Sequence, residues 1–345
     1  MFNDRIKKLN NIDNYDGDFI LYWMQHSQRV EYNHALSYSI HMANNQQKPL
    51  IVCFVLNEEF PQGNERNFTF MLEGLKEVSN KLKSIGIPFI ILKGDPIKKI
   101  LDLSYKASVI ITDRGYLRIE KYWREELSKN LQKSFIQIES DVVIPVDVLS
   151  NKEEYSAATI RRKINKLIVN YDKEFKNIEY EIQSENYIAI SNEVDIDDIK
   201  IVISDLSIDK TVKKSNCYKG GYSQAKEKLE EFMNHKLKFY GEFKNDPSRD
   251  LLSGLSPYLH FGQISPLEIL VALRNTPIAE KGSFLEELIV RRELSINFVS
   301  YNKNYDNVNS IPVWAKTSLL FHNKDKRPYV YSLNQLEHGL THDKY

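Results

Sequence analysis

The sequence has few cysteines and no long apolar run. Of its 345 residues, only Cys53 and Cys217 are cysteines, too few for a disulfide framework or a cysteine-rich zinc site. The longest apolar run near the N-terminus, residues 49–56, is far too short to span a bilayer. Residues 1–11 are polar and lack the apolar core of a signal peptide. We therefore expect a cytoplasmic protein that is a monomer and has no membrane partner.

Neither positive nor negative charge is in excess. The 47 Lys and Arg residues balance the 47 Asp and Glu residues, so the formal net charge is zero. This balance excludes a uniformly basic surface, and any binding of nucleic acid must use a local patch. The candidates for such a patch in the second half of the chain are Lys213, Lys214, Lys219, Lys236, Lys238 and Arg249.

Several catalytic signatures are missing. No predicted strand is followed by G-x-G-x-x-G or by a Walker A loop, which disfavours a standard dinucleotide or P-loop site. The sequence has no H-E-x-x-H, C-x-x-C or G-x-S-x-G motif. Zinc protease, thiol redox and serine hydrolase functions therefore have no support, and no metal site is predicted.

The first half of the chain alternates strand and helix patterns. Five short apolar runs predict buried parallel strands at residues 19–23, 50–56, 88–92, 109–111 and 135–138. Between them, amphipathic stripes and the N-cap Asp95-Pro96 predict helices, including residues 68–82 and 117–131. This order predicts a doubly wound α/β domain with a parallel sheet over residues 1–170.

The second half has a different pattern. Residues 171–215 are polar with weak periodicity and predict a long interdomain connection. Residues 216–345 predict an all-α domain. Its helices are expected over residues 222–240 and 284–298, after the N-caps Ser256 and Ser265, and at residues 333–338.

Two segments have residue types suited to ligand binding or catalysis. At Leu252-Ser253-Gly254-Leu255-Ser256, two hydroxyls and a glycine precede a helix, which suits a phosphate, although plain N-capping explains the pattern equally. Residues 286–294 place charges in an otherwise apolar helix, where Glu287 and Arg291 are spaced for an i,i+4 pair. A solvated helix face is the alternative interpretation of that second segment.

The motifs occur in a familiar order. They include Val30-Glu31-Tyr32-Asn33-His34, Asp113-Arg114-Gly115-Tyr116, Leu255-Ser256-Pro257-Tyr258-Leu259-His260-Phe261-Gly262, Glu287-Leu288-Ile289-Val290-Arg291-Arg292-Glu293-Leu294 and Thr341-His342-Asp343. In this order the chain resembles the class II cyclobutane pyrimidine dimer photolyases of the photolyase/cryptochrome superfamily. The resemblance extends over nearly the whole chain.

The resemblance implies a fold, a reaction and a site. An α/β domain, a long connection and a helical domain holding FAD are expected, and the reaction is light-driven splitting of pyrimidine dimers in UV-damaged DNA by reduced FAD. The family pattern assigns FAD contacts to Tyr240, Leu252, Ser253, Gly254, Leu255 and Ser256. It assigns Glu293 to the dimer, with Arg291 or Arg292 orienting Glu293 or neutralising the flavin. Whether an antenna chromophore binds the α/β domain, and which one, is left open.

The chain departs from the family pattern at its end. In these photolyases a tryptophan and then Asn-Ala-Ala-Gln follow Thr-His-Asp, whereas this sequence ends at Tyr345. The comparison therefore predicts a truncated chain with an incomplete flavin site, weak FAD binding and little repair. Two alternative hypotheses stay open: the protein is a non-catalytic, cryptochrome-like flavin or nucleotide binder, or it is an inactive remnant.

Overall fold

A computed structural model describes residues 3–182 and 192–344. The chain forms two compact units, Met1–Tyr301 and Asn302–Tyr345. The division into domains 1–170, 171–215 and 216–345 stays a prediction. Residues 183–191 of the expected connection and the final Tyr345 lie outside the described residues.

The first unit contains a six-stranded sheet with the order β1-β6-β5-β2-β3-β4. Its strands are β1 (Ile6–Lys8), β2 (Phe19–Met24), β3 (Leu50–Leu56), β4 (Phe89–Lys93), β5 (Ala107–Asp113) and β6 (Ser134–Ile138). The five strands expected from apolar runs are parallel neighbours, and β1 pairs antiparallel with β6 after the short helix η1 (Asn3–Arg5). Because β1 reads Ile-Lys-Lys and is largely exposed, it has no apolar run that could have predicted it.

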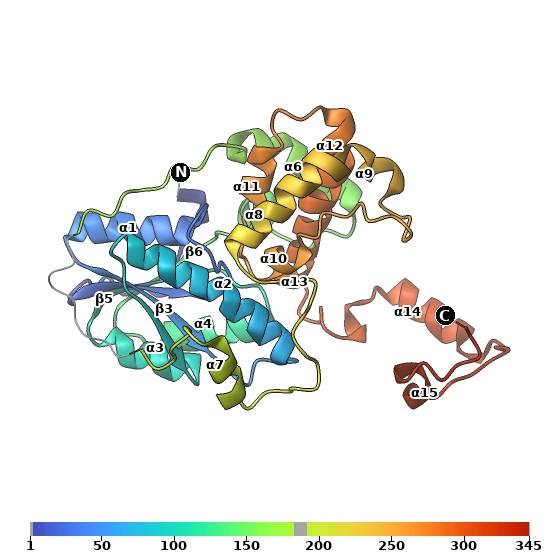
Figure 1. The fold of residues 1–345 in the computed structure, drawn as a ribbon, viewed down its shortest axis with the longest axis horizontal. Helices are drawn as coiled ribbons and strands as arrows, with labels where there is room; N and C mark the ends of the chain where they lie inside the picture. The colour runs from blue at the N-terminus through green and yellow to red at the C-terminus, as the bar shows by residue number, and fades with distance from the viewer. Residues whose placement is uncertain (1–2, 183–191, 345) are drawn as a thin grey trace. The chain divides into compact units, whose positions relative to one another are not determined.

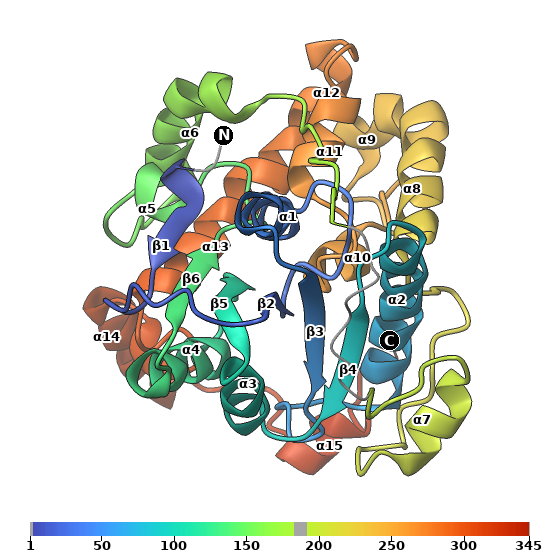
Figure 2. The same cartoon turned by 90° about the vertical axis from the view of Figure 1, so that its left-hand side faces the viewer.

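Helices cover both faces of this sheet, so the predicted doubly wound fold is confirmed (Figure 2). Alternate strand residues such as Tyr22 pack with α1 (His34–Gln46) and α2 (Glu65–Ser84). The intervening residues, such as Trp23, pack with α3 (Pro96–Ser104) and α4 (Arg118–Asn130). The strand order reverses between β2 and β5, and ligands of such sheets bind at the carboxyl ends of the strands near that point.

The connection after the sheet packs against the sheet layers instead of crossing open solvent. After α5 (Val146–Leu149) and α6 (Ala157–Tyr171), the described part from residue 192 onward contains α7 (Ile199–Asp205). Val194, Ile196 and Val202 are buried in the same core as α2. The weak periodicity of this segment did not reveal that burial.

A layer of helices completes the first unit (Figure 1). It consists of α8 (Tyr222–Glu231), η3 (Phe232–Lys236), α9 (Leu237–Phe243), α10 (Ser256–His260), α11 (Pro266–Ala272), α12 (Ile278–Leu285), η4 (Glu286–Arg291) and α13 (Arg292–Tyr301). Both long helices predicted here are interrupted by a turn of π-helix, η3 and η4. Ser265 caps α11 as predicted, but Ser256 is the first residue of α10 and not its N-cap, because Leu255 occupies the cap position.

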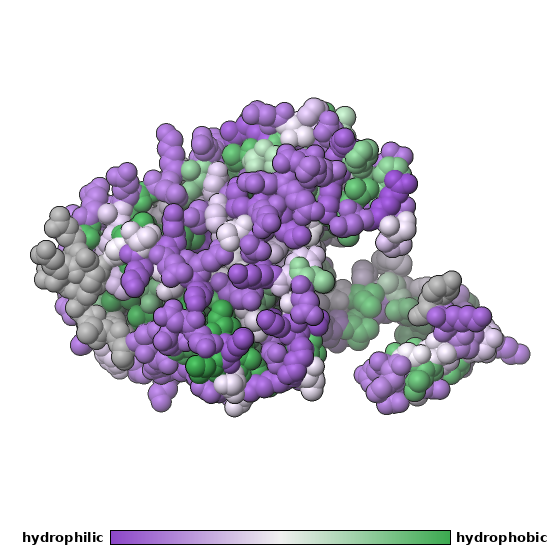
Figure 3. Space-filling view, in the orientation of Figure 1, coloured by the Kyte–Doolittle hydropathy of each residue, from purple (hydrophilic) through white to green (hydrophobic). Residues whose placement is uncertain are grey.

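The second unit contains η5 (Val308–Ser310), α14 (Val313–Phe321), η6 (His322–Lys324) and α15 (Leu333–Glu337). The sequence predicted α15 but not α14. Neither helix buries any of its residues. Among the residues that the structure describes, no strand follows Gly221, and no helix is both long and apolar enough to cross a membrane. In the view of Figure 3, hydrophilic side chains dominate the surface over α2 and α8.

Candidate functional site

The segment from Leu252 to Ser256 connects α9 to α10 and is rich in free donors. Leu255 is buried, whereas Leu252 and Ser256 are exposed. The Ser253 hydroxyl accepts a hydrogen bond from the Leu255 N–H at 3.3 Å. Within the described part of the chain, the backbone N–H groups of Ser253, Gly254 and Ser256 make no hydrogen bond. Three free N–H groups within four residues suit an anion of the phosphate type.

Tyr240 lies in the same core as this segment. Its ring meets Phe232 and Phe284 edge to face, with ring centroids 5.5 Å apart in both pairs. Leu255 belongs to the same hydrophobic cluster. The structure therefore brings two of the parts expected to hold a flavin, α9 and residues 252–256, into one layer.

Glu287, which the sequence analysis named only as a partner for Arg291, lies beside Tyr240. The Lys244 ammonium donates to Glu287 Oε1 at 2.6 Å and lies 5.7 Å from the centre of the Tyr240 ring. The Glu287 side chain is 42% exposed, so a ligand can reach it. Burial, and secondarily the charge of Glu287, raise the pKa of Tyr240.

The i,i+4 pair expected between Glu287 and Arg291 does not form. Arg291 Nε instead lies 3.5 Å from Glu286 Oε1, and Arg161 Nη2 donates to the same oxygen at 2.6 Å. The reason is the π-turn η4, in which residues five apart share a side of the helix. The prediction assumed α-helical spacing.

Glu293 is buried on the side of α13 that faces the segment after β6. Its side chain accepts hydrogen bonds at Oε1 from the N–H groups of Val143 at 2.8 Å and Ile144 at 3.2 Å. Within the described residues, its Oε2 has no partner. Burial raises the pKa of Glu293 to about 7, although these two N–H groups and nearby arginines act in the opposite direction. Glu293 therefore contacts the segment after β6, whereas Glu287 pairs with Lys244.

A buried cluster of charges around Asp141 joins the helical layer to the sheet. Asp141 accepts from Arg29 at 3.1 Å and from Arg292 at 2.6 Å, and its Oδ2 lies 3.2 Å from His26 Nε2. Burial by itself raises the pKa of Asp141, but Arg292, His26 and Arg29 outweigh burial and lower it. Burial lowers the pKa of His26, but hydrogen bonds to Asp141 and Glu120 prevail and raise it to about 10. His26 is therefore an imidazolium at neutral pH.

A glycine allows the two layers to meet at this point. Gly262, just after α10, has a φ of +63° and its carbonyl accepts from Arg29 at 2.8 Å. A Cβ at this position would collide with the backbone carbonyl of His26. Only glycine fits both the left-handed conformation and the close approach.

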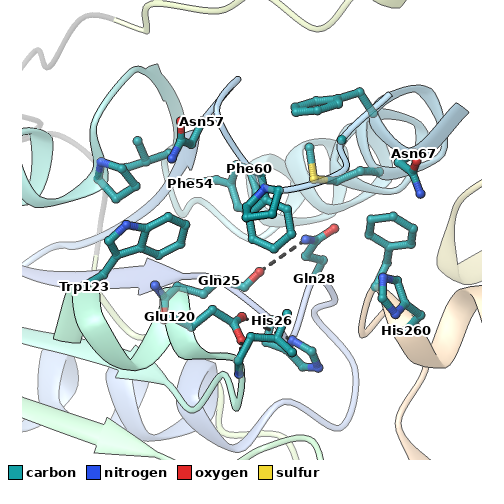
Figure 4. A pocket seen from close by; sticks show the side chains of 18 of the residues that line it. Gln25, His26, Gln28, Phe54, Asn57, Phe60, Asn67, Glu120, Trp123 and His260 are labelled. Carbon is teal, nitrogen blue, oxygen red and sulfur yellow. Dashed lines mark hydrogen bonds and ion pairs between the residues drawn. The ribbon is translucent and has the colours of Figure 1, made fainter. Parts of the chain in front are cut away.

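A cavity of about 380 Å³ opens at the carboxyl ends of β2 and β3, near the reversal in strand order. Figure 4 shows its side chains. Its walls include the aromatic side chains of Trp23, Phe54, Phe60, Phe68, Trp123 and Phe261. The rings of Phe60 and Trp123 have centroids 6.3 Å apart. The sequence analysis expected a ligand at this edge of the sheet but named none of these residues.

Each of two buried amides in this cavity has one atom without a hydrogen-bond partner among the described residues. Gln25 and Gln28 line it and are 8% and 6% exposed. Gln28 Nε2 donates to the Gln25 carbonyl at 3.2 Å, which leaves Gln28 Oε1 as a free acceptor. Gln25 Nε2 is a free donor among the described residues. A buried polar atom without a partner costs about 1–3 kcal/mol, so a ligand that pairs with both amides is favoured. No group of His, Cys, Asp and Glu residues suited to a metal ion occurs in residues 3–182 and 192–344.

Comparison with known sequences finds photolyases in each case. The DNA photolyase family matches residues 20–179. The deoxyribodipyrimidine photo-lyase of Methanothermobacter thermautotrophicus is 39% identical over 343 residues, which cover 99% of this chain and 75% of that protein. The deoxyribodipyrimidine photo-lyase of Potorous tridactylus is 37% identical over 94% of this chain and 61% of that protein.

A solved structure with a similar fold is the archaeal photolyase from Sulfolobus tokodaii, described as containing two FAD molecules and implying a novel light-harvesting cofactor. It matches with a TM-score of 0.63 at 17% identity, over 88% of this chain and 67% of that one. At this identity the likeness concerns the fold alone.

Proposed function

The chain belongs to the DNA photolyase family, and from that premise we propose that it is a class II photolyase that splits cyclobutane pyrimidine dimers in UV-damaged DNA. The observation that carries the proposal is the run of free backbone donors at Ser253, Gly254 and Ser256, in the same layer as Tyr240. Reduced FAD, when bound, would supply the electron on absorbing light. The residues of this chain would hold and orient the flavin and the pyrimidine dimer and shield them from water.

The donors of residues 252–256 fit the pyrophosphate of FAD. Free N–H groups and the exposed Ser256 offer hydrogen bonds to anionic oxygens, while buried Leu255 fixes the segment to the core. Tyr240 is held by its aromatic neighbours with its ring beside Lys244, so it offers a rigid surface at the edge of the site.

Glu287 is the carboxyl group that a lesion can approach. It is half-exposed and paired with Lys244, and its carboxylate accepts hydrogen bonds from ring N–H groups such as those of pyrimidines. A contact of Glu293 with the dimer stays a prediction; its Oε1 already accepts two backbone hydrogen bonds and the residue is 2% exposed, so a lesion would have to reach the buried Oε2. We therefore assign the lesion contact to Glu287 and a positioning role to Glu293.

The first test of this proposal is repair under blue light with excess FAD. Glu287→Gln is expected to lower the rate of dimer splitting about tenfold with FAD still bound, because the charged acceptor near the lesion is lost. Glu293→Gln is the matched control on the same helical segment and should keep most of the activity. Loss of thymine dimers in irradiated oligonucleotides is measured alongside flavin absorbance after gel filtration.

The same measurements distinguish the other outcomes. Ser253→Ala with Ser256→Ala should reduce FAD retention, because two hydroxyls leave the phosphate segment. Stoichiometric FAD without any dimer loss in the wild-type protein would contradict photolyase activity and favour a non-catalytic flavin binder. A tenfold loss in Glu293→Gln alone would reverse the assignment of the two carboxyl groups.

Binding to DNA is expected to use the exposed lysines of the helical half. Lys213, Lys236 and Arg249 already pair with acidic side chains. Lys219 and Lys238 are exposed and have no ion pair among the described residues. For each phosphate contact removed, the slope of log affinity against log salt should become less steep by about 0.9. Lys219→Ala with Lys238→Ala tests this in a filter-binding titration, and Lys106→Ala, before β5 at the opposite end of the strands, is the control.

We further propose that the cavity at the ends of β2 and β3 holds the antenna chromophore. Its aromatic walls suit a planar ring, and Gln25 and Gln28 offer the ring an unpaired donor and acceptor. The second FAD of the Sulfolobus tokodaii structure agrees with a chromophore besides the catalytic flavin in a relative of this fold.

A further inference from the structure

A hollow of about 560 Å³ lies between α2 and residues 214–218, the segment that leads into α8. In Figure 1 the chain between α7 and α8 runs beside α2. The volume falls in the range of about 300–1,000 Å³ that is usual for small-molecule sites. The hollow shares Asn67 and Phe261 with the aromatic cavity, but its described lining residues come from helices and loops and from no strand. It is therefore a separate candidate site from the cavity at the ends of β2 and β3.

Hydrogen bonds tie this segment to α2 at both ends of the hollow. At one end, the Lys213 ammonium lies 2.9 Å from Glu65 Oε2, and Arg66 Nε donates to the Lys213 carbonyl at 3.0 Å. At the other end, the Gly220 N–H donates to Glu73 Oε2 at 2.7 Å. Gly220 approaches α2 so closely that a Cβ there would collide with the backbone of the helix. The residues between these two ties span the hollow, so its walls are fixed by the fold and the space is preformed.

The hollow is positively charged near the start of α2. Arg66 is the second residue of this helix, and its guanidinium has no ion pair in the described part of the chain. Lys214 lines the same hollow, is exposed and likewise has no ion pair among the described residues. The acidic lining residue, Glu73, lies two helical turns further along α2, about 10 Å away. The amino-terminal end of α2 adds to the positive potential, so this end of the hollow suits a phosphate.

Aromatic rings line the rest of the hollow, at Phe70, Tyr218 and Phe261. The Tyr218 side chain is 37% exposed, and its ring centroid lies 6.4 Å from that of buried Tyr258, which supports it from one side. Beside the rings, the side-chain amides of Asn67 and Asn216 make no hydrogen bond within residues 3–182 and 192–344. An accessible ring with free amides next to it suits a nucleobase, which stacks on one and pairs its polar edge with the other.

We propose that this hollow binds a nucleoside monophosphate, with its base on Tyr218 and its phosphate on Arg66 and Lys214. A mononucleotide carries both of the groups that the hollow is built to receive, whereas a nucleoside lacks the anion and a sugar phosphate lacks the ring. The inference goes beyond the proposed repair function, because it involves neither the flavin segment nor a reaction with light.

Cys217 lines the hollow and reports on its occupancy. It is exposed, whereas Cys53 is buried and burial raises the pKa of the Cys53 thiol, so the neutral reagent iodoacetamide should modify Cys217 selectively. In the dark, AMP at about 1 mM is expected to slow this labelling at least about fivefold, and adenosine or ribose 5-phosphate less than about twofold. GMP, CMP and TMP are run in parallel to cover the other bases. Mass spectrometry of the full chain measures the labelled fraction.

Substitutions in the hollow test the charge and the ring separately, each against the unliganded rate of the same variant. Arg66→Gln with Lys214→Gln should reduce the protection by AMP to that given by adenosine. Arg162→Gln with Lys166→Gln, on the exposed side of α6, removes the same charge and should keep full protection. Tyr218→Leu should lose most of the protection, whereas Tyr218→Phe, which retains the ring, should keep it.

A further variant separates this site from the flavin segment. In Ser253→Ala with Ser256→Ala the protection by AMP should be unchanged, and its loss there would place AMP on the flavin segment and overturn the inference. Protection by none of the four nucleotides, or equal protection by AMP and ribose 5-phosphate, would also overturn it. Because the labelling needs neither light nor flavin, its result is independent of whether the protein repairs DNA.

Discussion

Replacing Asp141 by alanine is expected to lower the free energy of unfolding by about 3–5 kcal/mol. Asp141 is fully buried and holds Arg29, Arg292 and His26 in one cluster. Without its carboxylate, the buried Arg29 and the partly buried imidazolium of His26 are left with too little compensating charge. Urea denaturation at neutral pH measures the loss, and the NMR titration of His26 should show its pKa falling from about 10.

Asp13→Ala is the matched control for this loss. Asp13 pairs with Lys8, but its side chain is 70% exposed. Exposed ion pairs contribute less than about 1 kcal/mol, so this variant should be close to the wild type. Similar losses for Asp13→Ala and Asp141→Ala would contradict the view that the buried cluster joins the helical layer to the sheet.

Stability is expected to depend on pH through Glu293. Its pKa is raised from 4.5 to about 7 by burial, so the folded protein binds the proton more strongly than the unfolded chain does. The contribution of the protonated carboxyl is fully present below about pH 4.5 and is lost as the pH rises toward about 7. At about 1.4 kcal/mol per pKa unit, the loss amounts to about 3 kcal/mol.

Glu293→Gln removes this titration and keeps an oxygen that can accept from Val143 and Ile144. Relative to the wild type, the variant should therefore gain about 3 kcal/mol between pH 4.5 and pH 8. The measurement is urea denaturation at several pH values, with Glu287→Gln as a half-exposed control on the same helical segment. A difference between Glu293→Gln and the wild type that does not change with pH would show that Glu293 does not titrate in this range.

The interior of the α/β layers was predictable because its signals are local. Residues 50–56 form one apolar run, and β3 has the same bounds. Asp95 followed by Pro96 predicted the start of α3, where the Asp95 carboxylate does accept from the first turn. The edge strand β1 and the packing of residues 194–206 have no comparable local signal, since pairing and burial there depend on partners far along the chain.

The candidate site was predictable only in part. Residues 252–256 and Tyr240 were found through the family pattern, and the structure places them in one layer. The burial of Glu293 and the pairing of Glu287 with Lys244 could not be predicted from spacing, because the π-turn η4 rotates each side chain after Glu286 relative to an α-helix. The same turn is why Arg291 lies over Glu286 and not over Glu287.

The sequence by itself determined the five parallel strands, most of the helices that cover them, the family and the segment suited to phosphate. These follow from apolar periodicity, capping residues and motifs, which act over a few neighbouring residues. Only the tertiary structure decided which carboxyl group is buried and which is accessible. It also decided that Asp141 joins the layers, and that Gln25 Nε2 and Gln28 Oε1 have no hydrogen-bond partner among the described residues. Burial, the pairing of charges and the shape of a cavity depend on side chains that lie far apart in the sequence, such as Arg29 and Asp141, and no local pattern encodes them.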